Sequence, residues 1–194
     1  MNKKELVFAS NNAHKLGEIQ QLLGDRFVIK SLRDLGCTED IPENEATLEG
    51  NAQAKARFVH EKYGCDCFAD DTGLLVESLD GAPGVYSARY AGPECNSVRN
   101  IEKLLKELEG KSNRKAAFKT VISLIQGEEV YFFEGSVKGS IASACLGNDG
   151  FGYDPVFIPE GSDLSFAEMS LSEKNKISHR ARAVRALVDY LNTD

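Results

Sequence analysis

Cys67-Phe68-Ala69-Asp70-Asp71-Thr72-Gly73-Leu74 is the stretch that decides the fold. A short apolar run ends in two adjacent carboxylates, which predicts a buried strand that delivers acids to the edge of a sheet. In open α/β sheets, ligands bind beyond the carboxyl ends of the strands. Two neighbouring acids also favour a hard cation such as Mg²⁺, which proteins commonly hold with one or two carboxylates and substrate phosphates. The alternative is an exposed turn, since Asp, Thr and Gly are ordinary turn residues.

The composition is that of an ordinary globular protein. The chain has 194 residues, of which 42% are apolar and 27% charged, so it is long enough for one domain with its own core. The formal net charge is -7. This excess of acid argues against sequence-independent binding to a nucleic-acid backbone, and we expect no nucleic-acid partner.

The cysteines and the apolar runs indicate where the protein works. There are five cysteines, an odd number, and no CxxC pair, so we expect free, buried thiols in a reducing compartment rather than a zinc site. No apolar run is long enough for a signal peptide or a membrane span. We therefore expect a cytoplasmic protein with no membrane partner.

The N-terminal segment has the layout of a phosphate site. Glu5–Ala9 is predicted to be a strand, Ser10–Lys15 forms a polar loop, and apolar residues then recur at helical spacing up to a stop at Gly24. Backbone N–H groups and a Lys at a helix start suit a phosphate. A plain strand-to-helix turn is the alternative, since neither standard glycine-rich fingerprint is present.

The next segment combines acids with a helix. An acidic loop around Pro42 precedes a predicted helix at Thr47–Tyr63, which Thr47 can cap. Asn51 and Lys55 are four residues apart and therefore share one face of that helix. The alternative for this pair is a solvated surface position.

The second half of the chain is predicted to be richer in strands. Residues 116–125 and 129–137 read as an antiparallel hairpin, and 140–145 as a further short strand. We expect one domain over residues 1–194, with a smaller β-rich lobe at about 116–141.

The C-terminal third carries cations at two helix starts. Ser170 and Glu173 fit a capping box, with Lys174 following, and Ser178-His179-Arg180 opens the last helix. Positive charge at a helix start opposes the helix dipole, so it points to an anionic or electron-rich partner. The alternative is a pair of solvated surface cations.

Taken together, these motifs resemble the inosine triphosphate pyrophosphatase family. The likeness runs from about residue 5 to 190 and preserves order and spacing. The matching motifs are Ser10-Asn11-Asn12-Ala13-His14-Lys15, Asn51-Ala52 with Lys55-Ala56, Ala69-Asp70-Asp71-Thr72-Gly73-Leu74, Gly81 to Tyr90, Gly150-Phe151-Gly152-Tyr153-Asp154-Pro155, Glu173-Lys174 and Ser178-His179-Arg180.

The resemblance implies a fold and a reaction. The expected fold is α/β, with a mixed, strongly twisted sheet flanked by helices and two lobes around a central cleft, usually in a homodimer. The expected reaction is hydrolysis of the purine nucleoside triphosphates ITP, dITP and XTP to the monophosphate and pyrophosphate. The expected cofactor is Mg²⁺.

The resemblance also suggests roles for individual residues at the phosphate end. Asp71 corresponds to the family's catalytic aspartate, which orients or deprotonates the attacking water, and it also contacts the metal. Glu43 corresponds to the second metal ligand, although Glu45 is a close rival. The residues expected to bind the substrate here are Ser10, Asn11, Asn12, Ala13, His14, Lys15, Lys55 and Thr72.

At the base end, the resemblance points to a set of hydrogen-bond donors. Lys174, His179 and Arg180 would donate hydrogen bonds to the keto oxygen at C6 of inosine or xanthosine. They would reject the amino group of adenosine, because a donor facing a donor is left unpaired. Phe151 could stack on the purine, and Gly152 would let the backbone approach it. Tyr153 and Asp154 complete this loop.

Two other functions remain open at this point. One is a related pyrophosphatase for modified pyrimidine or other nucleotides, against which the donor set at the purine edge argues. The other is a nucleotide-binding module without turnover, against which Asp71, Glu43 and Lys15 argue, since a sensor needs no poised base.

Overall fold

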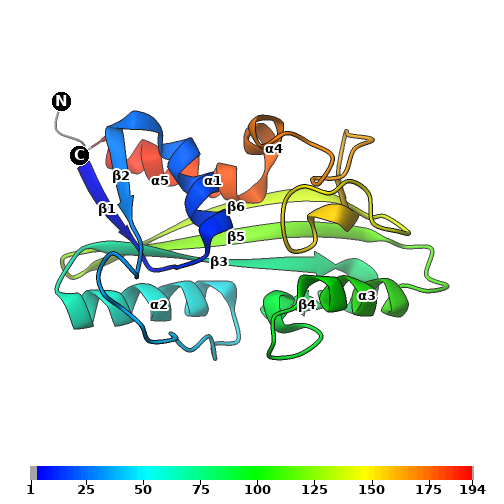
Figure 1. Ribbon diagram of the computed structural model, residues 1–194, viewed down its shortest axis with the longest axis horizontal. Helices are drawn as coiled ribbons and strands as arrows, with labels where there is room; N and C mark the ends of the chain where they lie inside the picture. Colours follow the sequence, from blue (N-terminus) through cyan, green and yellow to red (C-terminus); the bar gives the residue numbers. More distant parts are fainter. Residues whose placement is uncertain (1–3, 194) are drawn as a thin grey trace. The chain divides into compact units, whose positions relative to one another are not determined.

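A computed structural model describes residues 4–193 of the chain (Figure 1). Within that range the strands are β1 (Lys4–Phe8), β2 (Phe27–Lys30), β3 (Cys67–Val76), β4 (Pro83–Gly84), β5 (Lys115–Gln126), β6 (Glu129–Ile141) and β7 (Phe157–Pro159). The α-helices are α1 (Ala13–Leu23), α2 (Leu48–Tyr63), α3 (Ser97–Glu107), α4 (Leu171–Ile177) and α5 (His179–Leu191).

The strands form one mixed sheet, which confirms the predicted fold class. Hydrogen bonding orders them β2-β1-β3-β5-β6-β7, and β4 pairs with β3. β1 is parallel to both β2 and β3, whereas β4 and β7 are antiparallel to their neighbours. Two residues join β5 to β6, a link that only antiparallel neighbours allow.

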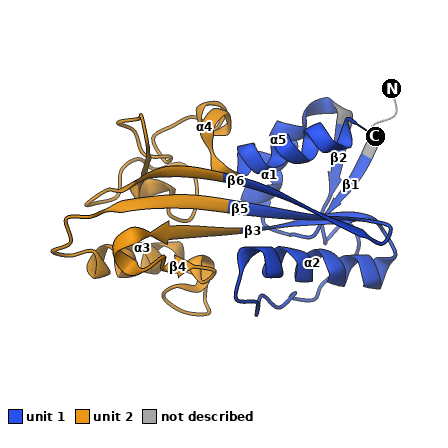
Figure 2. Cartoon of the chain, turned by 180° about the vertical axis from the view of Figure 1, so that it is seen from behind, with its two compact units in different colours: residues 1–71, 120–135, 180–194 blue, residues 72–119, 136–179 orange. Residues whose placement is uncertain are grey.

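The chain divides into two compact units, which Figure 2 colours separately. Among the described residues, the first unit holds 4–71, 120–135 and 180–193, and the second holds 72–119 and 136–179. Strands β3, β5 and β6 each contribute residues to both. The central cleft, and the smaller lobe at residues 116–141, stay predictions.

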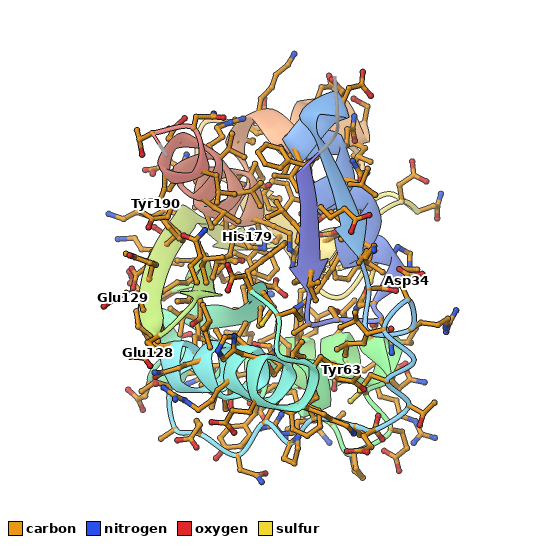
Figure 3. The ribbon with its side chains drawn as sticks, turned by 90° about the vertical axis from the view of Figure 1, so that its left-hand side faces the viewer. Asp34, Tyr63, Glu128, Glu129, His179 and Tyr190 are labelled. Atoms are coloured by element: carbon orange, nitrogen blue, oxygen red, sulfur yellow. The ribbon has the colours of Figure 1, made fainter. Side chains whose placement is uncertain are left out.

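The first unit has helices on both faces of its strands. α1 and α5 lie on one face and α2 on the other, as Figure 3 shows from the end of the sheet. One apolar cluster joins strands β1 and β3 to α1 and α5, with Phe8 stacked on Phe68 at 4.8 Å between ring centres. A second cluster packs Ala56 and Val59 of α2 against the opposite face. Burial on both faces explains why β3 opens as an apolar run.

The second unit is built around aromatic rings. Phe118, Phe157 and Phe166 lie in one apolar cluster, with the Phe118 and Phe157 ring centres 4.6 Å apart. α3 adds Ile101 and Leu104 to the same cluster. Each of these rings contributes a large buried surface, because aromatic side chains bury more area than most other residues do.

The helices begin where local side-chain chemistry predicts. The side chain of Asn12 accepts the N–H groups of residues 14 and 15 at the start of α1, and Thr47 accepts the N–H of residue 50 at the start of α2. Asn96 caps α3. Ser170 and Glu173 form the expected capping box on α4. Each cap satisfies an N–H that the helix itself leaves without a partner.

One expectation about β3 is wrong. The strand does not end at the acids, because Asp70 and Asp71 lie in the middle of it and it continues to Val76. The strand that ends here is its parallel neighbour β1, whose last paired residue, Phe8, lies opposite Phe68. The acids therefore lie just beyond the carboxyl end of β1 rather than at the end of their own strand.

A smaller expectation, that of a strand at residues 140–145, is also wrong. Ser140 and Ile141 complete β6, and the chain then leaves the strand as the N–H of Ala142 bonds to the carbonyl of Val156.

In the range 4–193, no helix is both long and apolar enough to span a membrane.

The cysteines are all free, but they are not all buried as expected: Cys37 and Cys67 are buried, whereas Cys95 and Cys145 are exposed. Burial raises the pKa of Cys67 to about 12, because an apolar environment solvates the thiolate poorly. Its Sγ donates to the carbonyl of Ala56 at 3.1 Å.

We expect Cys67 to resist alkylation. The thiolate is the reactive form, and the raised pKa of Cys67 leaves the thiol protonated at pH 8. Treatment of the folded protein with iodoacetamide, followed by peptide mass spectrometry, should find Cys95 and Cys145 labelled first. Labelling of Cys67 at the same rate would contradict the raised pKa.

Candidate active site

The polar loop after β1 is fixed by its own side chains. Ser10 Oγ accepts the N–H of Asn12 at 3.1 Å, and Asn12 Oδ1 accepts the N–H groups of His14 and Lys15 at 3.0 and 3.1 Å. Asn11 Oδ1 accepts the N–H of residue 33 at 2.8 Å. Residues 11–14 are nevertheless exposed. The loop is thus a preformed, accessible helix start, which is the geometry that suits an anion.

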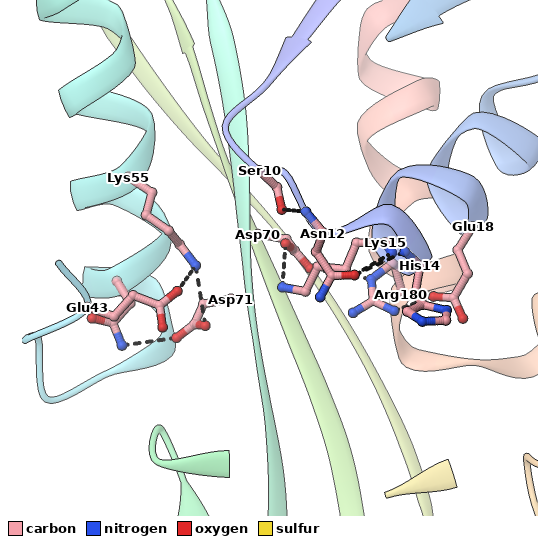
Figure 4. A network of polar contacts seen from close by, with 11 residues as sticks. Ser10, Asn12, His14, Lys15, Glu18, Glu43, Lys55, Asp70, Asp71 and Arg180 are labelled. Carbon is pink, nitrogen blue, oxygen red and sulfur yellow. Dashed lines mark hydrogen bonds and ion pairs between the residues drawn. The ribbon is translucent and has the colours of Figure 1, made fainter. Parts of the chain in front are cut away.

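Asp70 lies at the centre of a buried group of charges, drawn in Figure 4. Its two oxygens accept from Lys15 Nζ at 2.8 Å and from Arg180 Nε at 3.3 Å. Arg180 also pairs with Glu18 of α1. Burial alone would raise the pKa of Asp70, but the charges of Lys15 and Arg180 outweigh it and hold that pKa well below its ordinary value. The carboxylate is therefore ionised, and each of its oxygens is bonded to one of these cations.

Asp71 has a separate set of partners, all from α2 and the loop before it. Its Oδ2 accepts from Asn51 Nδ2 at 3.0 Å, and its Oδ1 lies 3.5 Å from Lys55 Nζ. Lys55 Nζ also donates to Glu43 Oε1 at 2.5 Å. Burial raises the pKa of Asp71; the charge of Lys55 opposes this effect and that of Glu43 adds to it. Asp71 is thus a stronger base than an ordinary aspartate.

The two acids do not share one site, contrary to the expectation that they would hold a cation together. Successive side chains of a strand point to opposite faces. Asp70 accordingly meets Lys15 from α1, and Asp71 meets Lys55 from α2, on either side of β3 in Figure 4.

Glu43 and Asp71 converge on one cation, the ammonium group of Lys55. Glu45, the rival of Glu43, is exposed and contributes its backbone N–H to Asn51 instead. Within residues 4–193, no group of three or more His, Cys, Asp or Glu side chains is arranged to hold a metal ion. Two carboxylates are nevertheless a usual protein contribution to a Mg²⁺ site, where phosphates and waters complete the shell.

The second unit holds the remaining predicted residues. Lys174 Nζ donates to Asp154 Oδ2 at 2.7 Å, with both side chains buried, and lies 5.1 Å from the ring centre of Phe151. Asp154 Oδ2 also accepts the N–H of Phe151 at 2.8 Å. Gly152 has a φ of 62°. This loop is thus held by one buried carboxylate and its cation.

Three more predicted residues have defined surroundings in the second unit. Tyr153 donates its hydroxyl to the carbonyl of Ser87 at 2.8 Å. His179 is buried and stacks on Phe118, with 4.5 Å between ring centres and 17° between planes. Thr72 follows Asp71 on β3 and is half-buried. His179 and Arg180 do not lie at the solvated surface, since only 3% of the surface of His179 and 2% of that of Arg180 is exposed.

Sequence reasoning missed Glu18 and gave no role to Asn51, both of which lie in the first unit. Glu18, which pairs with Arg180, is three residues after Lys15 on α1, and that spacing gives no sign of a partner 162 positions away. Asn51 belongs to a recognised motif, but its spacing from Lys55 does not reveal that the shared face is buried. Both Asn51 and Lys55 are buried here.

Comparisons with known proteins extend these observations. The chain matches the Ham1 family model over residues 6–190. A relative from Porphyromonas gingivalis, named dITP/XTP pyrophosphatase, is 58% identical over 189 residues, or 97% of each chain. The solved structure of the Staphylococcus aureus Ham1 protein has a TM-score of 0.89 at 38% identity, covering 98% of this chain and 99% of that one. A HAM1 protein from Coxiella burnetii has a TM-score of 0.90 at 37% identity, covering 98% and 100%.

We expect Asp70→Asn to destabilise the protein strongly. Removing this charge leaves the buried Arg180 and the half-buried Lys15 with less compensation, and breaking a buried ion pair costs about 3–5 kcal/mol. Urea unfolding should show that loss at neutral pH. The exposed Asp25→Asn is the control and should stay within about 0.5 kcal/mol of the parent. Equal stability of the two variants would contradict a structural role for the charge of Asp70.

Proposed function

The chain belongs to the Ham1 family, and on this basis we propose that it hydrolyses dITP, XTP and ITP to the monophosphate and pyrophosphate. The resemblance that the sequence motifs indicate is confirmed, and the chain is a nucleoside-triphosphate pyrophosphatase, a hydrolase. One observation carries the finer proposal: Asp71 and Glu43 converge on Lys55 in the unit that also holds the polar loop at residues 10–15.

The polar loop is the proposed triphosphate site. The start of α1 is exposed at residues 11–14, and the positive end of the helix dipole favours negative charge there. The loop from Ser10 to His14 needs little reordering on binding, since Ser10 and Asn12 already hold it. Lys15 adds a positive charge, and its hydrogen bond to Asp70 orients its side chain. Lys55 adds a second cation, and Thr72 is a further proposed substrate contact.

Asp71 is the proposed catalytic base. Attack at the α-phosphorus requires a water molecule that is oriented and relieved of a proton. A buried carboxylate with a raised pKa takes up that proton more readily than a solvated one. Asn51 holds one oxygen of Asp71 through its N–H, so the orientation of the carboxylate is defined before substrate arrives.

Mg²⁺ is the proposed cofactor, with Glu43 and Asp71 as its ligands. The fit rests on two carboxylates that already face a single positive group, the ammonium of Lys55, and on oxygen donors being what Mg²⁺ prefers. When bound, Mg²⁺ would neutralise charge on the phosphate oxygens of the substrate.

Lys174, His179 and Arg180 are the proposed donors to the purine keto group. Lys174 is oriented by Asp154 and His179 by its stacking on Phe118. Arg180 is bonded to two carboxylates, and a guanidinium with five N–H groups can donate to a ligand as well. Sites built on such hydrogen bonds discriminate by roughly 10⁴.

Phe151 is the proposed stacking partner of the base, and Gly152, Tyr153 and Asp154 shape the loop around it.

We further propose that the enzyme is a homodimer that acts on the nucleotide pool in the cytoplasm. Light scattering coupled to size-exclusion chromatography measures the first of these two properties directly.

Pyrophosphate release from ITP, XTP, GTP and ATP tests the function. We expect rapid cleavage of ITP and XTP with Mg²⁺, little cleavage of ATP, and loss of activity with a chelator. We also expect little cleavage of GTP, whose C6 keto group matches the donors, so its exclusion has to come from the 2-amino group. Equal rates on all four would overturn the keto-edge account but leave a pyrophosphatase. A preference for modified pyrimidine triphosphates would favour the related pyrophosphatase instead.

Asp71→Asn tests the base. We expect its kcat for ITP to fall by at least about 100-fold, since general-base catalysis contributes roughly 10² to 10⁴. Calorimetric titration should show that the variant still binds ITP. The exposed Asp163→Asn is a control that should retain parental activity. Full activity of Asp71→Asn would refute the proposed mechanism.

A further inference from the structure

Asn51 has an environment that its sequence position does not predict. It lies on α2 with no exposed surface, and buried amides must find hydrogen-bond partners for both ends. Its Oδ1 accepts the backbone N–H of Glu45 at 3.0 Å, and its Nδ2 donates to Asp71 Oδ2 at 3.0 Å. The orientation of the amide is therefore fixed, because a backbone N–H only donates and a carboxylate only accepts.

The loop that Asn51 holds is also packed tightly against the first turn of α2. A Cβ on Gly50 would lie 2.8 Å from the Cβ of Glu45, closer than real side chains allow. Thr47 Oγ1 accepts the N–H of Gly50 at 3.0 Å and closes the same turn. The segment that carries Glu43 is thus tied down two residues later, at Glu45.

Lys55 completes the arrangement. It follows Asn51 by one helical turn, so both side chains leave the same face of α2. Its ammonium lies 2.5 Å from Glu43 and 3.5 Å from Asp71. Three groups thus meet on this face: the carboxylate from β3, the carboxylate from the loop, and the cation from the helix.

We propose that Asn51 is a positioning residue, whose side-chain amide fixes Asp71 and the Glu43 loop together so that both carboxylates face one cation position. The inference rests on the proposed function, since positioning matters only if Asp71 and Glu43 act on the substrate. Asn51 itself touches neither substrate nor metal in this scheme. It holds Asp71 Oδ2 and leaves Oδ1 on the side of Lys55.

The chain offers a matched control in Asn100 of α3. Asn100 is also buried, with 3% of its surface exposed, and it too bridges two segments. Its Oδ1 accepts the N–H of Ala91 at 2.7 Å, and its Nδ2 donates to the carbonyl of Ala88 at 2.8 Å. Its Nδ2 also lies 3.4 Å from the carbonyl of Ser87. All of these partners are backbone groups and none is a carboxylate, so we expect the loss of Asn100 to lower stability without releasing Asp71.

The hydrogen bond to Asp71 can be tested without substrate or metal. Asn51→Asp keeps the acceptor for Glu45 but sets a carboxylate against Asp71, so its melting temperature in a chelator should fall. In the double variant Asn51→Asp with Asp71→Asn, the donor and acceptor exchange places and the bond is restored. We expect the double variant to melt at least about 4 °C above Asn51→Asp.

The Asp71→Asn single variant completes the cycle. If the effects of the two substitutions on the melting temperature simply add, the side chains are not coupled and the inference is overturned.

Kinetics separate positioning from plain stabilisation. In Asn51→Ala we expect kcat for ITP to fall about 10- to 100-fold, the usual effect of losing a supporting hydrogen bond, with KM changed less than about threefold. The melting temperature of Asn100→Ala should fall by a comparable amount. Its kcat should stay at the parental value when it is measured at a temperature at which both alanine variants are folded. Equal kcat in the two variants would overturn the inference.

The failure of the proposed function would look different. If the parent protein releases no pyrophosphate from any triphosphate, the function is wrong. An active parent with an unimpaired Asn51→Ala variant refutes the positioning role alone.

Discussion

The alternation of side chains along β3 is the constraint on which the site depends. Asp70 and Asp71 are both buried, and a buried charge is tolerated only beside a compensating one. Because adjacent residues of a strand face opposite ways, each acid must find its cation in a different layer. Asp70 finds Lys15 on α1 and Arg180 on α5, and Asp71 finds Lys55 on α2. The two helical layers of the first unit are thus each joined to the sheet by an ion pair.

This separation divides the work between two residues that look equivalent in the sequence. Asp70 has a lowered pKa and two strong partners, which makes it a fixed anion that orients Lys15. Asp71 has a raised pKa and a longer contact to its cation, which suits the proton transfer proposed for it. This difference in pKa comes from the neighbours on each face rather than from the acids themselves.

The features that were predictable from sequence depend on local chemistry. Thr47 and Ser170 cap their helices because a hydroxyl beside a helix start has an N–H within reach whatever the rest of the chain does. The position of the acids within β3 was not predictable, since it depends on where β1 ends. The Arg180–Glu18 pair and the burial of Asn51 are set by packing between distant segments. The ordered motifs identified the family, which no single residue could have done.

The division of the chain at Asp71 and Thr72, and again at His179 and Arg180, bears on how such a protein can evolve. The backbone passes from one compact unit to the other four times, so neither unit is a continuous stretch of gene. Recombination at a single point cannot exchange one unit for a homologous version while keeping the other. Substrate range in this lineage would therefore have to change through point substitutions and loop replacements, not through the shuffling of modules.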